Sequence, residues 1–222
     1  MATSGSIDFT LTRTEIIEEA FQLIGIGMEG EDLSPFMTET ASRSLNMMIK
    51  TWETKGAKLW ATSDATLALV AGTASYTLTP RPLEVFNVRI SSSSQETPMM
   101  PLSREEYFAL PDKTSQGIPT QYFFDPGRTT GTLYIWPTSS NATDEIKYNY
   151  QRTLEDMDGN SDEPDFPQEW LETITTNLAM KLRPKYGRPY DPDLDRRARE
   201  LENDLLAWGQ ENESIFIGID YD

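Results

Sequence analysis

The sequence of 222 residues contains neither cysteine nor histidine. Without cysteine the chain has no disulfides, no thiolate metal sites and no cysteine nucleophile. Without histidine it lacks serine–histidine–aspartate triads, imidazole metal ligands and the usual general base near neutral pH. Most hydrolase and zinc chemistries are therefore excluded. Mechanisms that use only carboxylates remain open, and so does a protein that is not an enzyme.

Long apolar runs are also missing. No stretch approaches the ~20 apolar residues that span a membrane. The first six residues, Met-Ala-Thr-Ser-Gly-Ser, have neither the basic start nor the apolar stretch of a signal peptide. The sequence therefore predicts no membrane association and no secretion signal. We also expect no cofactor, because no residue pattern indicates one.

Basic residues are scarce: 19 Lys and Arg stand against 36 Asp and Glu, which gives a net charge of −17. Such a chain repels nucleic acid phosphates, so a protein that grips DNA over its whole surface is disfavoured. The acidity favours solubility, and it also suits a protein that duplex DNA passes without sticking. The length and the 37% apolar content are sufficient for one large domain or two small ones.

Helical patterns occupy both ends of the chain. Thr12 to Glu15 has the form of a capping box, and Ser34-Pro35 is an N-cap followed by proline at the first helical position. Pro167 and Asp191-Pro192 begin two further apolar repeats of helical spacing. We therefore predict an α+β fold in which an N-terminal helix pair, residues 1–58, and a C-terminal helix pair, residues 167–213, form a four-helix bundle.

The middle of the chain, residues 59–152, carries short β-prone runs separated by turn residues. They are organised around the stretch Gly117–Pro137, which reads as a hairpin because apolar residues alternate on both sides of a turn. Phe86, Val88 and Ile90 are expected on one face of another strand. A second capping box, Ser103 to Glu106, predicts a short helix. These runs predict an inserted antiparallel β-sandwich or open barrel.

Aromatic residues are dense in this middle segment. They are Tyr122, Phe123, Phe124, Tyr134, Trp136, Tyr148 and Tyr150. A stacking platform for single-stranded nucleic acid needs interleaved basic residues, and only Arg128 and Lys147 are present. We therefore predict that these rings pack in the core and across strands.

Residues 153–166 form an acidic run with helix breakers, which predicts a solvated linker. The part from Asp156 to Asp162 begins like a calcium loop, with acidic or amide side chains at alternate positions. Ser161, however, stands where the loop glycine belongs, and Pro167 stands where the bidentate glutamate belongs. A calcium-dependent binding module remains an alternative function.

The last nine residues, 214–222, are predicted to form an extended arm. Its apolar side chains are Ile215, Phe216, Ile217, Ile219 and Tyr221. Such a segment is too apolar for a solvated terminus, and it is β-prone. It is expected either to return to the chain's own sheet or to add to a neighbouring subunit.

Several short stretches, in their order and spacing, resemble one protein family. They are Tyr76-Thr-Leu78, Pro82-Leu-Glu-Val85, Gly117-Ile-Pro119-Thr-Gln-Tyr122, Leu133-Tyr-Ile-Trp-Pro137, Ile146-Lys-Tyr-Asn-Tyr150 and Pro167-Gln-Glu-Trp-Leu171. The pattern is similar to the head-to-tail adaptors, or connectors, of tailed bacteriophages. Within these it resembles the podovirus type, the packaged-DNA stabilisation protein or tail tubular protein A class.

The resemblance implies a structural virion protein and no catalytic residue. Such proteins form a ring, typically of about twelve subunits, in which one heterologous contact is repeated until it closes. The ring lies beneath the portal protein, joins it to the tail nozzle protein and helps retain packaged DNA, while duplex DNA passes through its lumen without sequence-specific contact. The expected location is the head–tail junction of the virion, and the host cytoplasm during assembly.

Two surfaces are expected to bind partners in such a ring. The apolar arm is expected to dock on the portal or on a neighbouring subunit. The hairpin turn, Pro126, Gly127 and Arg128, is expected to contact the nozzle or a neighbour. A second alternative function is a virion-associated glycosidase that degrades peptidoglycan with two carboxylates, which needs no histidine. The 36 acidic residues offer many such pairs, and the sequence singles out none.

Overall fold

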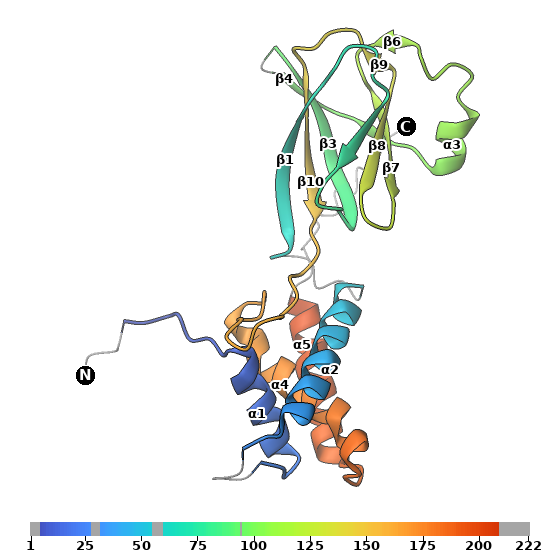
Figure 1. Ribbon diagram of the computed structural model, residues 1–222. Coiled ribbons are helices and arrows are strands. Elements are labelled where there is room, and N and C mark those ends of the chain that lie inside the picture. The colour runs from blue at the N-terminus through green and yellow to red at the C-terminus, as the bar shows by residue number, and fades with distance from the viewer. Residues whose placement is uncertain (1–4, 28–31, 55–59, 94, 209–222) are drawn as a thin grey trace, which may run out of the picture. The chain divides into compact units, whose positions relative to one another are not determined.

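The computed structural model describes residues 5–27, 32–54, 60–93 and 95–208 (Figure 1). The chain divides into two compact units. The helical unit combines Met1–Trp60 with Leu154–Asp222, and the β unit is the continuous segment Ala61–Thr153. Apart from one short helix in the β unit, the helices and the antiparallel strands lie in separate parts of the chain, and the α+β class is confirmed.

Four α-helices and two short 3₁₀ turns make up the described part of the helical unit. They are α1 Arg13–Leu23, α2 Pro35–Glu53, η1 Gln168–Trp170, α4 Leu171–Leu182, η2 Arg183–Tyr186 and α5 Pro192–Trp208. The predicted helix starts are confirmed. Thr12 and Glu15 form a reciprocal capping box, and the Ser34 hydroxyl caps α2. The Asp191 carboxylate accepts two backbone N–H groups at the start of α5.

Helix α4 is central to the packing of this unit, because it contacts α1, α2 and α5. Its Ile174, Leu178 and Leu182 are completely buried. The four rings of Trp52, Trp60, Phe166 and Trp170 form a cluster in which neighbouring centroids lie between 5.2 and 6.0 Å apart. Burying large aromatic rings removes much apolar surface from water, so this cluster is a main source of stability in the unit.

The acidic segment 153–166 docks on α1 and α2. Leu154 and Met157 are buried, with 2% and 1% of their surfaces exposed. Arg13 Nη1 donates to the Met157 carbonyl at 2.9 Å, and Lys50 Nζ donates to the Leu154 carbonyl at 2.6 Å. The prediction of a solvated linker is therefore wrong for these positions. The prediction failed because the residues that bind the segment, Arg13 and Lys50, lie 144 and 104 positions away along the chain.

Two four-stranded sheets form the β unit. The first has the order β1-β10-β3-β4 and the second the order β2-β8-β7-β5. Their bounds are β1 Thr62–Ala68, β2 Ser75–Leu78, β3 Glu84–Ser92, β4 Gln95–Pro98, β5 Met100–Pro101, β7 Gln121–Pro126, β8 Gly131–Trp136 and β10 Glu145–Gln151. A parallel pair, β6 Gln116–Gly117 and β9 Thr138–Ser139, and helix α3 Arg104–Ala109 complete the unit.

Side chains from both sheets share one hydrophobic core. Val88 and Ile146 come from the first sheet, and Leu133 and Ile135 from the second. The predicted hairpin is confirmed: β7 and β8 pair antiparallel, with Tyr122 opposite Ile135. The capping box before α3 is also confirmed. The two inner faces thus pack together as in a β-sandwich.

Strand β3 departs from simple alternation. Val85, Val88 and Ile90 are buried, whereas Phe86 is only half-buried, so the prediction of Phe86 on the buried face is wrong. The pairing with β10 shifts between Lys147 and Asn149, which marks a bulge on β3. A bulge adds one residue and moves the following side chains to the other face of the sheet.

The chain enters and leaves the β unit at neighbouring positions. The Arg152 N–H donates to the Ala61 carbonyl at 2.8 Å, and Thr62 pairs with Gln151. The ends of the insert are thus tied to each other within the β unit itself.

Candidate interaction surfaces

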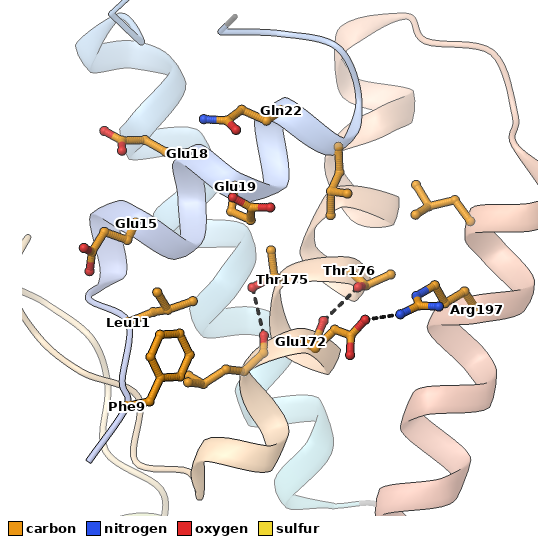
Figure 2. A pocket seen from close by; sticks show the side chains of 13 residues that line it. Phe9, Leu11, Glu15, Glu18, Glu19, Gln22, Glu172, Thr175, Thr176 and Arg197 are labelled. Atoms are coloured by element: carbon orange, nitrogen blue, oxygen red, sulfur yellow. Dashed lines mark hydrogen bonds and ion pairs between the residues drawn. The ribbon is translucent and has the colours of Figure 1, made fainter. Parts of the chain in front are cut away.

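A groove of about 670 Å³ runs along the helical unit between α1, α4 and α5 (Figure 2). It is called the α1–α4–α5 groove below. Its apolar lining comes from Phe9, Leu11, Leu23, Leu171 and Leu194. Phe9 is 67% exposed and Leu23 is 42% exposed. A contiguous patch of exposed apolar side chains often marks a binding site, so this groove is a candidate docking surface.

Carboxylates line the α1 side of the groove. Glu15 belongs to the capping box, and hydrogen bonds from the Thr12 hydroxyl and N–H lower the pKa of its carboxyl group. Glu18 and Glu19 are exposed on the next turn. Glu172 on α4 forms an ion pair with Arg197 on α5. Three α1 carboxylates therefore make this edge of the groove negative.

Basic residues gather in the segment 181–190, called the α4–α5 turn below. Its sequence is Lys-Leu-Arg-Pro-Lys-Tyr-Gly-Arg-Pro-Tyr, with four cations and no acidic residue. Arg183 pairs with Asp191 at 3.4 Å. Lys185 Nζ donates to the Ser44 hydroxyl at 2.5 Å, and Arg188 donates to the Gly25 carbonyl at 2.7 Å. The last two bonds hold the side chains in place but leave their charges unneutralised.

Lys181 adds to the positive charge of the α4–α5 turn. Burial lowers the pKa of its ammonium group, and the nearby Lys185 lowers it further. Gly187 adopts a left-handed conformation with φ 65°, which lets the chain reverse after η2. The Tyr186 ring packs edge-on against Phe21 at 5.1 Å, so the turn is anchored to α1.

An aromatic cluster lies on the outer face of the second sheet, with Phe123 and Tyr107 buried in it. Phe123 and Tyr134 point away from the core, because neighbouring residues of a strand face opposite sides. Their rings stack at 5.7 Å, and Tyr107 of α3 lies 4.9 Å from Tyr134. The Arg104 guanidinium lies 5.4 Å from the Phe123 centroid. The predicted packing of aromatic rings across strands is confirmed for Phe123 and Tyr134, whereas nothing in the sequence indicated that α3 covers them.

A family comparison identifies the class of protein. The family model described as the SU10 adaptor protein matches residues 12–211. The chain belongs to this family of phage head-tail adaptors. No curated protein matches it. The match confirms the resemblance to phage adaptors that the sequence indicated. The adaptor is a structural component of the head–tail region of the virion, where it associates with other proteins.

The predicted hairpin turn of the adaptor is exposed. Pro126, Gly127 and Arg128 all lie on the surface, and the Arg128 carbonyl accepts a hydrogen bond from Arg81 Nη1 at 3.1 Å. A Cβ at Gly127 would lie 2.4 Å from the Thr130 carbonyl oxygen, so only glycine fits there. The turn therefore presents an exposed basic residue, Arg128, beside a glycine that no other residue can replace without a clash.

The predicted apolar arm of the adaptor lies outside the described residues. This applies to all five of its apolar side chains, Ile215, Phe216, Ile217, Ile219 and Tyr221. The groove itself was missed in the sequence, because α1 is separated from α4 and α5 by the whole β unit.

The partial calcium pattern of the adaptor is used for internal contacts. Asp156 forms an ion pair with Lys50 at 3.0 Å, and the Asp162 carboxylate accepts the Gly159 N–H at 2.6 Å. The Asn160 side chain accepts a hydrogen bond from Arg13. Within the described ranges no group of three or more acidic side chains is placed to hold a metal ion. Nor is any described helix both long and apolar enough to cross a bilayer.

Proposed function

We propose that the adaptor is the subunit of a closed ring of about twelve copies that attaches beneath the portal and joins it to the tail nozzle. The ring helps retain packaged DNA and leaves a channel for its passage. Subunits assemble in the host cytoplasm, with the N- and C-terminal helix pairs forming a four-helix bundle. The family match carries this proposal, because it spans residues 12–211 and so includes both units.

The net charge of the chain supports the proposed channel for DNA. With a net charge of −17, a ring of such subunits presents an acidic surface overall. DNA phosphates are repelled by carboxylates, so duplex DNA slides past such a wall rather than binding to it. We expect duplex DNA to be retained by the assembled ring and not to bind the free subunit at physiological salt.

Attachment to the portal tests the main proposal. Purified adaptor is mixed with a purified portal ring, and the mixture is viewed by electron microscopy. We expect a ring of adaptor density on one face of the portal, while the adaptor alone stays monomeric or weakly associated. A portal that remains bare at saturating adaptor concentration would contradict the proposal.

The terminal arm is proposed to dock on the portal or on a neighbouring subunit, and the hairpin turn at Pro126 to Arg128 to contact the nozzle or a neighbour. Deleting residues 214–222 is expected to abolish portal attachment and leave the fold unchanged by circular dichroism. Normal attachment of the truncated chain would remove the arm from the proposal. Arg128→Ala is the matched test of the turn, with nozzle binding as the readout.

The adaptor is proposed to act by assembly and not by catalysis. Neither comparison supports the glycosidase alternative. Purified adaptor is expected to release no fragments from peptidoglycan and to give no heat when calcium is added in a calorimeter. Release of fragments would instead establish a carboxylate-based hydrolase.

A further inference from the structure

Two surfaces of the helical unit have opposite charge and similar apolar character. The α1–α4–α5 groove carries Glu15, Glu18 and Glu19 beside exposed Phe9 and Leu23. The α4–α5 turn carries Lys181, Lys185 and Arg188, and its Tyr190 ring is 68% exposed. Among the described residues, neither set of three charges is neutralised by an ion pair of its own.

The two surfaces lie on different sides of the unit. Lys181 follows Glu172 by nine residues on α4, which at 3.6 residues per turn places it on the opposite side of the helix. Glu172 lines the groove, whereas Lys185, four residues beyond Lys181, bonds to Ser44 of α2. The described lining of the groove contains no residue of α2.

From this geometry we infer that the α4–α5 turn of one copy docks into the α1–α4–α5 groove of the next copy. The inference rests on the proposed ring and names the contact that builds it. A ring needs a heterologous contact between two different surfaces of the same chain, placed on different sides of it. Complementary charge selects the partner and orients it, and burial of the groove's apolar side chains against Pro184 and Tyr190 supplies affinity.

A second copy explains the α4–α5 turn better than DNA does. A surface that binds DNA phosphates needs only cations, because the phosphates are the same in every DNA sequence. Here the exposed Tyr190 ring and two prolines accompany the cations, and the same chain offers an acidic apolar groove of about 670 Å³. DNA binding by the turn is therefore an outcome that the experiment must distinguish.

The absence of cysteine makes a cross-linking test clean. Glu19→Cys and Lys185→Cys are made as separate full-length chains, mixed, and oxidised mildly, both free at high concentration and bound to the portal. We expect a disulfide-linked heterodimer by mass spectrometry. The control replaces Glu19→Cys with Glu39→Cys, another exposed glutamate, on α2 outside the groove. Absence of the heterodimer in both states, or equal yield with the control, would overturn the inference.

Charge reversal gives an independent readout. Glu18→Lys in the chain with Glu19→Cys, and Arg188→Glu in the chain with Lys185→Cys, are each expected to lower the yield of the heterodimer strongly, whereas mixing the two altered chains restores it. Circular dichroism verifies that each variant folds. If a chain with Lys181→Glu and Lys185→Glu assembles normally on the portal but loses DNA retention, the turn binds DNA and the inference fails. If cross-linking succeeds but the portal stays bare, the contact stands and the portal proposal fails.

Discussion

The helical unit and the β unit are held together over different distances along the chain. The β unit is one continuous segment, closed by hairpins and by pairing of its first and last strands. The helical unit is built from two segments with the whole insert between them, and contacts such as that between Arg13 and Asn160 span 147 residues. The difference teaches that the β unit can be completed from its own segment of the chain, whereas the helical unit depends on which residues on either side of that segment meet.

Removing a central ring tests whether the two units are independent. Trp170→Ala is expected to cost the helical unit about 3–5 kcal/mol, because the indole is 1% exposed and packs on three other rings. Hydrogen exchange measured on both units should show lost protection in the helices alone. Ile135→Ala is the counterpart in the β unit. Lost protection of the strands in Trp170→Ala would show that the units are energetically coupled.

The docked acidic segment tests the long-range contacts of the helical unit. Arg13→Ala removes a charged donor from the carbonyls of Met157 and Asp158, at 2.9 and 2.6 Å. We expect a loss of about 1.5–3 kcal/mol in urea unfolding. Arg43→Ala is the control, since its ion pair with Glu39 is exposed and is worth at most about 0.5 kcal/mol. Equal losses would mean that the hydrogen bonds of Arg13 contribute no more than an exposed ion pair.

Close packing in the hairpin tests the β unit. A Cβ at Gly131 would lie 2.5 Å from Phe124 Cε2, so Gly131→Ala must displace that ring, at a cost of about 1–3 kcal/mol. At Gly117 the nearest atoms would be 3.6 Å away, and Gly117→Ala should be close to neutral. Thermal unfolding of the two variants measures the difference, and similar melting temperatures would contradict the packing argument.

The smallest expected effect is the loss of a capping hydroxyl, which can be compared between the two units. Thr12→Ala and Ser103→Ala should each cost about 1 kcal/mol. Hydrogen bonds from Thr12 and Ser103 lower the pKa values of Glu15 and Glu106. Since each folded pKa is below the unfolded one, the stabilisation is complete above the ordinary glutamate pKa of about 4.3 and is lost as the pH falls through the folded pKa. Unfolding at pH 7 and pH 3 should show the effect of each substitution shrinking in acid.

The parts of the fold that could be predicted are indicated by residues that lie close together in the sequence. Thr12 and Ser103 each stand three residues before a glutamate, and the strands β7 and β8 flank a turn rich in proline and glycine. Strand β4, Gln95–Pro98, was missed because it is exposed at every position and shows no apolar alternation. The docking of Met157 and the α1–α4–α5 groove were missed because each depends on helices brought together from opposite ends of the chain.

The hydrogen bond between Arg152 and Ala61 has an evolutionary consequence. Because the two ends of the β unit meet, the helical frame accommodates the insert as it would a surface loop. Domain insertion is tolerated where the ends lie close together. The whole insert can therefore be exchanged by recombination at these two positions while the helical unit keeps its own packing.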